Sequence, residues 1–177
     1  GTATEPIVFT SSEEPGSRRR GDWAGLVLLG DAPINPEEGT ELVEGVDDER
    51  EYHRYGGDDP HGSCGKLQYV RVEFAGFDLA QDKELNGLTL GGCGDGTFIR
   101  YVQVHRGLDD GVEVFGGTVD LKYVVVSQPR DDSLDWDFGW QGRVQYLIVQ
   151  QEDTMGDNGF ETDSNGDGHD QLPRSSP

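Results

Sequence analysis

The sequence predicts an all-β fold, a parallel β-helix (solenoid) with coils of about 22–26 residues. Two observations predict it: short β-branched apolar runs lie between clusters of Gly, Asp and Asn, and one six-residue unit recurs four times. No stretch has the i, i+3, i+4, i+7 spacing of an amphipathic helix. The bunching of apolar residues argues against disorder, although 33% hydrophobic residues and a net charge of −21 are typical of disordered chains.

The repeated unit has tyrosine at its third position and aliphatic residues after it. Its copies are residues 67–72, 99–104, 121–126 and 144–149. A second unit follows each copy and begins at Asn86, Asp110, Asp132 or Asn158. Successive coils of a β-helix lie about 4.8 Å apart, so equivalent residues stack into columns. An antiparallel sandwich, the alternative, would not repeat the same unit at near-constant intervals.

Length and charge restrict the class of protein. The 177 residues predict one domain over 1–177, with a long acidic corner loop at 37–61 and an Asp/Gly-rich loop and tail at 163–177. The chain has 14 Lys+Arg against 35 Asp+Glu, which argues against nucleic acid and anionic membranes as partners. No apolar run approaches the roughly 18–20 residues of a membrane span, and no signal-peptide pattern opens the chain.

The two cysteines, Cys64 and Cys93, each lie in a Gly-rich corner before a repeat strand. Stacking of the coils brings both near the same corner, where a disulfide is within reach. We expect this bridge, with two free thiols as the alternative. A disulfide would place the protein in an oxidising, extracytoplasmic compartment, and the absence of a CxxC motif argues against cysteine-bound zinc.

Five motifs carry a resemblance to a known family: residues 6–11 (PIVFTS), 21–26 (GDWAGL), 86–92 (NGLTLGG), 109–113 (DDGVE) and 131–136 (DDSLDW). With these motifs the chain resembles a family of uncharacterised secreted bacterial surface proteins in the right-handed, pectate-lyase-like β-helix group. The resemblance implies a right-handed β-helix, a secreted or cell-surface location and no established activity. Chains of that family are usually longer, so it also implies a piece of a longer β-helix. Open coil ends would then pair with another copy.

The register of the acids is the main functional signal. Stacking would bring carboxylates of one column about 5 Å apart, where two charges repel by roughly 3–3.5 kcal/mol at an effective dielectric of ~20. They must therefore be protonated, hydrogen-bonded or bridged by a cation. For the column that contains Asp110 and Asp132, the interpretations are corner caps bonded to the backbone, a Ca²⁺ site or catalytic acids.

A second acidic column contains Glu113, Asp135 and Glu161, and its alternation with apolar residues places it in mid-strand. A corner-cap role is therefore excluded for this column. It predicts either a solvated acidic face, a Ca²⁺ site or catalytic acids.

A separate calcium signal lies near the C-terminus, where Asp163, Asn165, Asp167 and Asp170 follow a D-x-N-x-D-G order. The bidentate Glu of an EF-hand is missing, because Arg174 stands at that position. A loop that binds Ca²⁺ without EF-hand geometry and a flexible Asp/Gly turn both remain open. The first could share an ion with Glu161.

The case for an enzyme is weak, and we lean towards a non-catalytic protein. No Ser/His pair lies in a nucleophile-elbow context, and the histidines lack metal-ligand spacing. The alternative is a Ca²⁺-dependent polysaccharide lyase or glycoside hydrolase that uses Asp110, Asp132, Asp135 and Arg130. Arginine beside aspartate, however, is ordinarily a surface ion pair.

Aromatic residues offer another route to function. Strand alternation turns Tyr101 and Tyr123 outward, so the tyrosine column would stack against sugar rings; a bend before the valines would instead make it a ladder in the core. Trp136 and Trp140 crowd one loop, either as a corner plug or as a binding rim for carbohydrate or protein.

Together these features predict a non-catalytic extracellular module with a structural or adhesive role. We expect Ca²⁺ to stabilise it, and a polysaccharide or another copy of the chain to be its partner.

Overall fold

The computed structural model describes residues 1–46, 50–80, 83–166, 168 and 170–177. The elements, in chain order, are β1 (Ile7–Phe9), β2 (Leu26–Leu29), β3 (Glu41–Leu42), the 3₁₀ turn η1 (Glu51–His53), β4 (Arg54–Tyr55), β5 (Lys66–Glu73), β6 (Phe77–Ala80), β7 (Lys83–Leu85), β8 (Leu88–Gly91), β9 (Phe98–His105), β10 (Val112–Phe115), β11 (Leu121–Ser127), β12 (Leu134–Asp137) and β13 (Val144–Gln150).

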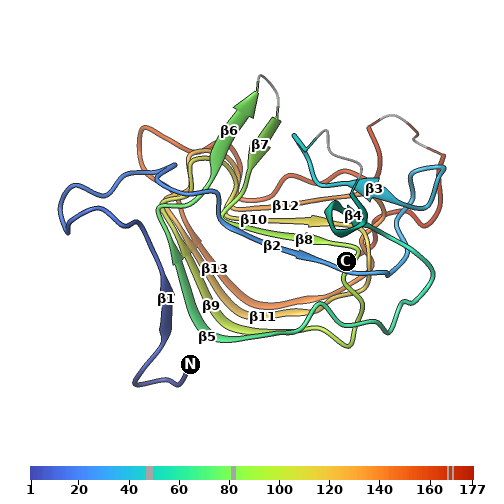
Figure 1. Cartoon of the computed structure of the whole chain (residues 1–177), viewed down its shortest axis with the longest axis horizontal. Helices are drawn as coiled ribbons and strands as arrows, with labels where there is room; N and C mark the ends of the chain where they lie inside the picture. Colours follow the sequence, from blue (N-terminus) through green and yellow to red (C-terminus); the bar gives the residue numbers. More distant parts are fainter. Residues whose placement is uncertain (47–49, 81–82, 167, 169) are drawn as a thin grey trace.

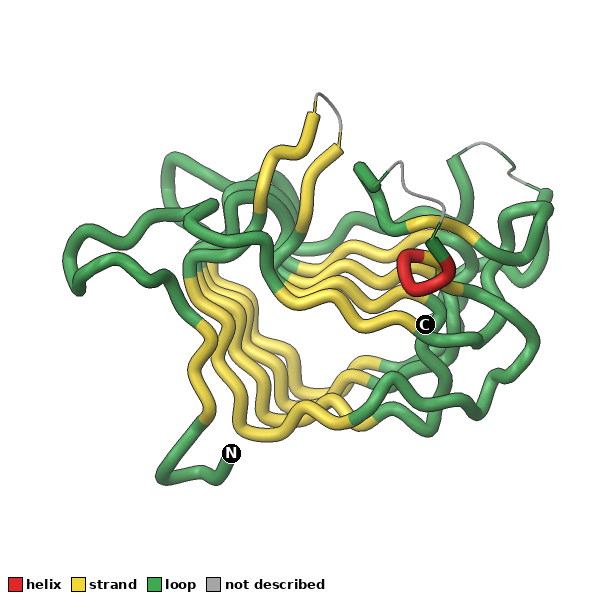
Figure 2. The backbone as a smooth tube through the Cα atoms, in the orientation of Figure 1, coloured by secondary structure: helices red, strands yellow, loops and turns green. Residues whose placement is uncertain are grey.

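The architecture is a right-handed parallel β-helix, as predicted. One parallel sheet has the order β1-β5-β9-β11-β13 and the other β12-β10-β8-β2. The chain alternates between the two sheets, which enclose the core between them (Figures 1 and 2). Among the described residues, no helix has the length and apolar character needed to cross a membrane.

The pairing confirms the register of both repeated units. Leu121 pairs with Ile99 on one side and Val144 on the other, and Val112 pairs with Leu88 and Leu134. The inward side chains of both sheets form one buried apolar core, which includes Val72, Val104, Val126, Leu90, Val114 and Leu134.

A bend inside each long strand explains the tyrosine position. Tyr69, Tyr101, Tyr123 and Tyr146 have φ angles of 53°, 58°, 57° and 63°, in the left-handed region. The bend interrupts strict alternation, so that both Ile99 and Val102, on either side of Tyr101, are buried. The tyrosine itself is turned out of the core.

The repeat alignment did not include the first coil, although two of the family motifs lie in it. Strand β1 pairs with β5, and β2 pairs with β8. Ile7 pairs with Val70, so Pro6 precedes β1 where the later coils have tyrosine.

The long segment 37–61 is more structured than the predicted corner loop. It contains η1 and the strands β3 and β4, which pair antiparallel to each other. A second insertion at a corner, formed by β6 and β7, is an antiparallel hairpin that projects from the coils (Figure 1).

Close packing explains the glycine after the Asx residue of the second unit. A Cβ atom on Gly111 would overlap Val126 Cγ1 and lie 2.7 Å from the carbonyl oxygen of Ser133. A Cβ atom on Gly87 would likewise overlap Val104 and the carbonyl oxygen of Gly111. Glycine is therefore required by the approach of the next coil.

The predicted disulfide between Cys64 and Cys93 is present, with a Cα–Cα distance of 5.5 Å. It joins the corners that precede β5 and β9. A disulfide fits an oxidising compartment.

Candidate functional site

Two neighbouring strands and one corner bring three carboxyl groups together. Glu113 on β10 pairs in register with Asp135 on β12, and Asp110 lies at the corner before β10. Their exposed fractions are 8%, 9% and 7%. Oxygen atoms of all three lie within 4.8 Å of one another. We call Asp110, Glu113 and Asp135 the inner acid cluster.

The burial of this cluster corrects one interpretation of the second acidic column. Glu113 and Asp135 point away from the core, as alternation predicted, but they do not form a solvated face. Residues 41–46, with Tyr55 and Phe138, line a cavity of about 670 Å³ with Glu113. Tyr55 is itself buried, and its ring lies 6.0 Å from that of Phe115. The sequence pattern gave no sign of this cover, because segment 37–61 lies outside the repeat.

Burial and mutual repulsion raise the pKa values of the cluster. Burial, followed by the charges of Asp109 and Asp135, raises the pKa of Asp110 to about 9. Burial and then Asp110 hold the pKa of Glu113 well above its usual range, and burial also raises the pKa of Asp135. In the described part of the chain, none of the three carboxyl groups has a Lys, Arg or His ion-pair partner. Lys83 lines the same cavity as Glu113, so the cluster has a cation nearby but no ion pair among the described residues.

Two oxygen atoms around the cluster have no hydrogen-bond partner among the described residues. One is Oδ1 of Asp135, and the other is Oδ1 of Asn86. Asn86 is only 2% exposed, and its Nδ2 donates to Glu113 Oε2, so its amide lies against the cluster. Buried polar atoms without partners are costly. They are suited to binding a hard cation, which takes carboxylate and amide oxygens.

The Asx column at the corners is a ladder of hydrogen bonds between coils. Asp110 Oδ1 accepts a bond of 2.9 Å from the backbone N–H of Asp132, and Asp132 Oδ1 accepts one from the N–H of Asn158. This confirms the corner-cap interpretation for both aspartates. Asp132 is buried, and its side chain holds the corner of the next coil.

A second, more open group of acids lies beside the cluster. Glu84, Asp109, Asp131 and Glu161 line a pocket of about 670 Å³ together with Arg130. Burial and then Asp131 raise the pKa of Asp109 to about 7. A side-chain hydrogen bond with Asp132, then burial, raises the pKa of Glu161 to about 7.

Arg130, the arginine of the lyase or hydrolase alternative, is half exposed and lies 3.8 Å from Asp78 in an ion pair. The acids suggested for catalysis are less accessible, because Asp110, Asp132 and Asp135 are all buried. Catalysis by Asp110, Asp132, Asp135 and Arg130 thus remains a prediction from the sequence, and the geometry adds no support to it.

The described candidate ligands of the C-terminal loop lie in different environments. Asn165 is buried and donates to Asn35 Oδ1 and Gln171 Oε1. Asp170 is exposed and pairs with Arg174 at 3.2 Å. Asp163 is also exposed, while Asp167 lies outside the described residues. The calcium hypothesis for this loop therefore stays a prediction.

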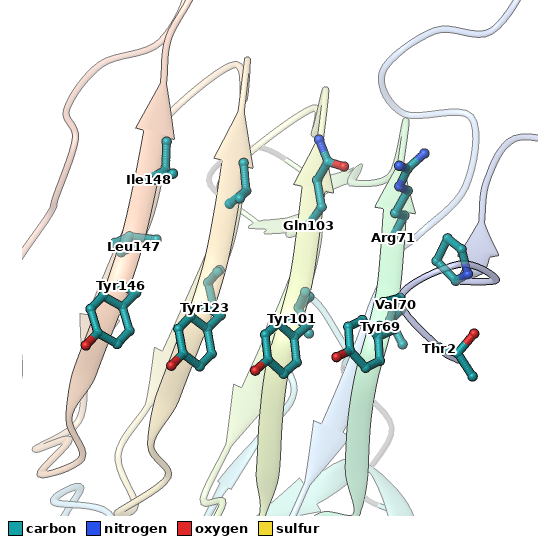
Figure 3. Close-up of a pocket in the computed structure, with 15 residues that line it drawn as sticks. Thr2, Tyr69, Val70, Arg71, Tyr101, Gln103, Tyr123, Tyr146, Leu147 and Ile148 are labelled. Atoms are coloured by element: carbon teal, nitrogen blue, oxygen red, sulfur yellow. The ribbon is translucent and has the colours of Figure 1, made fainter.

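The tyrosine column lines an open groove rather than the core, so the core-ladder alternative is wrong. Neighbouring rings are parallel, with centroids 4.6, 4.7 and 4.8 Å apart (Figure 3). Tyr101 is 39% exposed and Tyr146 60%. The groove has a volume of about 560 Å³, with Arg71, Gln103 and Ile148 also in its lining. We call it the tyrosine groove.

Stacking of the four rings on one another changes how this groove could bind a ligand. Each inner ring is covered on both faces by its neighbours, so sugar rings cannot stack on Tyr101 or Tyr123 as predicted. The phenol hydroxyl groups have no hydrogen-bond partner in the described structure and point in one direction (Figure 3). The groove therefore offers a row of hydroxyl groups and ring edges.

Trp140 is buried, so the binding-rim interpretation of its loop is wrong for this residue. Its exposed fraction is 0%, and its Nε1 donates to the carbonyl oxygen of Val119. Trp136 is partly buried, and its ring centroid lies 5.6 Å from that of Trp140. This supports the corner-plug interpretation, because both indoles pack with the apolar core.

A family described as a pectate-lyase like beta helix domain matches residues 1–177. None of the curated proteins and none of the solved structures matches the chain.

Proposed function

The chain belongs to the pectate-lyase-like β-helix family, and on this premise we propose that it is a non-catalytic extracellular module stabilised by Ca²⁺. The ion would bind the inner acid cluster. There it would tie the coil of β10 to that of β12. The role of such a module is structural or adhesive.

One observation carries this proposal: three buried carboxyl groups face one another without a cationic partner, beside the unpartnered oxygens of Asn86 and Asp135. Calcium takes six to eight oxygen ligands from carboxylates, amides and water. Three carboxylates and one amide can supply most of them. Extracellular location rests on the disulfide and on the type of fold.

Thermal unfolding tests the proposal. The chain is dialysed against EGTA and melted at pH 8, and then melted again with Ca²⁺ or Mg²⁺ at equal ionic strength. We expect Ca²⁺ to raise the midpoint saturably and more than Mg²⁺, because Mg²⁺ demands a stricter octahedral site. An unchanged midpoint would overturn the proposal.

A second candidate function is glycan contact in the tyrosine groove, favoured by its unpaired hydroxyl groups. Co-sedimentation with insoluble polysaccharides would test it. The variant Tyr101→Phe/Tyr123→Phe keeps the ring stack and removes two hydroxyl groups, so we expect weaker binding at unchanged stability. Equal binding by wild type and variant would contradict this role for the hydroxyl groups.

A further inference from the structure

A cluster of four arginines surrounds one pocket of this acidic protein. Arg18, Arg19 and Arg20 come from the segment between β1 and β2, and Arg106 directly follows β9. With Phe74 they line a pocket of about 290 Å³, which we call the arginine pocket. Such a concentration of guanidinium groups contrasts with the net charge of −21.

The fold fixes the position of two of these arginines. Arg106 has a φ of 56° and donates through its backbone N–H to the carbonyl oxygen of Ser127. Its Nε donates to Gln128 Oε1 at 2.8 Å. Arg20 reaches the same corner and donates to the carbonyl oxygen of Gln128 at 2.8 Å. The segment before β2 is thereby attached to the corner after β11.

The carboxylates near the arginine pocket are too few to neutralise its four guanidinium groups. Glu152 is the one carboxylate within ion-pair distance of any of the four in the described structure, at 3.1 Å from Arg20 and 3.5 Å from Arg106. Arg18 donates to neutral oxygens, the carbonyl of Glu13 and the hydroxyl of Thr10. The Asp22 carboxylate also interacts electrostatically with Arg19, which leaves four arginines against two carboxylates, so positive charge remains in excess.

One buried hydrogen-bond donor of Arg20 also lacks a partner. The Nε–H of Arg20 is shielded from solvent and makes no hydrogen bond within the described residues. The side chain of Arg20 is 16% exposed. This donor would gain a partner only if the Arg20 side chain moved to present it to an anion.

We propose that the arginine pocket binds a tetrahedral oxyanion, sulfate or phosphate, either free or as an ester on a polymer. Guanidinium groups bind such oxygens through two parallel hydrogen bonds, and a divalent anion offsets the charge that Glu152 and Asp22 leave unbalanced. Arg18 and Arg19 would close over the anion, while Arg20 and Arg106 would hold it from the corner.

Isothermal titration with inorganic sulfate, in calcium-free buffer with chloride as the balancing salt, tests the proposal. We expect saturable binding by the wild type and a loss of about tenfold or more in affinity for Arg18→Gln/Arg19→Gln. Arg19→Gln alone is a second variant in case the double variant does not fold. It should fold normally, since this exposed side chain has no ion pair in the described residues. Arg100→Gln, on the exposed face of β9, is the matched control and should bind like wild type.

Two outcomes would overturn the proposal: no saturable binding by the wild type, or equal affinity in wild type and double variant. Separate titrations with inorganic phosphate, dextran sulfate and neutral dextran identify the source. Binding of the inorganic ions alone indicates a free anion, whereas tighter binding of dextran sulfate indicates a sulfate ester on a polymer. Because calcium is absent throughout, the result is independent of the proposed cation site.

Discussion

Glu113 and Asp135 are register partners on β10 and β12, and both carboxyl groups are almost completely buried on the outer face of their sheet. Parallel pairing forces these side chains together, because equivalent positions of adjacent coils become neighbours. The charges must then be neutralised, by protons when metal is absent and by a cation when one is bound.

Removing one carboxylate should therefore raise the stability of the metal-free protein and reduce the stability gained from Ca²⁺. We expect Asp135→Asn to be more stable than wild type in EGTA at pH 8, by about 1–3 kcal/mol, because one repulsive partner is lost. In Ca²⁺ the variant should gain less stability than wild type. Denaturant unfolding measures both. Asp58→Asn, on an exposed loop, is the control; the same calcium response in Asp135→Asn and wild type would contradict the assignment.

The metal-free protein should become less stable as pH rises. Burial raises the pKa of Asp110 to about 9 in the folded chain, against about 3.9 when unfolded. The folded state thus binds more protons between these values, so stability present below pH 4 is lost progressively up to about pH 9, with a slope of at most about 1.4 kcal/mol per pH unit for this group.

Unfolding in urea across this pH range, with EGTA, measures the slope. Asp110→Asn should flatten it, since the amide does not titrate but can still accept from the N–H of Asp132. A slope identical in wild type and variant would argue against a buried protonated Asp110.

The disulfide should contribute substantially to stability. Cys64 and Cys93 are 29 residues apart in sequence, and closing such a loop is worth about 3–4 kcal/mol in the chain-entropy model. We expect Cys64→Ala/Cys93→Ala to lose that amount in urea unfolding. A reducing agent should destabilise wild type and leave the variant unaffected; a wild type indifferent to reduction would refute the prediction.

Tyr123 should stabilise the fold through its two ring stacks. Tyr123→Ala removes contacts with both Tyr101 and Tyr146, and each aromatic pair is worth about 0.5–1.5 kcal/mol beyond the buried area. A loss of roughly 1–3 kcal/mol is expected, whereas Tyr123→Phe should be near neutral. Equal losses in the two variants would show that the hydroxyl group matters rather than the stack.

Two glycines in one column should respond differently to alanine. Gly111→Ala forces a Cβ against Val126 and the Ser133 carbonyl oxygen, which should cost about 1–3 kcal/mol or more. Gly159 precedes Phe160 as Gly111 precedes Val112, yet its nearest neighbour is 3.8 Å away. Gly159→Ala should therefore be tolerated. Thermal melts of both variants compare them directly, and a tolerated Gly111→Ala would contradict the packing argument.

The sequence predicted the coils that share the repeated units and missed the features that lie outside those units. The tyrosine and Asx units set the register of coils from β5 onward, and the pairing of Leu121 with Ile99 confirms it. The first coil was left out of the repeat alignment because Pro6 precedes β1 where tyrosine stands later, and because segment 37–61 separates β2 from β5.

The same limit applies to the candidate site. The register predicted that Glu113 and Asp135 are neighbours. It did not predict the cavity beside Glu113, because residues 41–46, which line it, carry no periodic signal. Tyr55, which is buried over Phe115, could not be placed there from its neighbours in sequence. Likewise, outward alternation of Tyr101 was predicted, while the left-handed bend at each tyrosine was not.

A crystal structure of the protein, with crystals grown in calcium, would show whether the inner acid cluster binds the ion. We predict an anomalous peak with oxygens of Asp110, Glu113 and Asp135 within about 2.3–2.6 Å of the ion. A site free of metal at saturating calcium, with the three carboxyl groups hydrogen-bonded to one another, would contradict it.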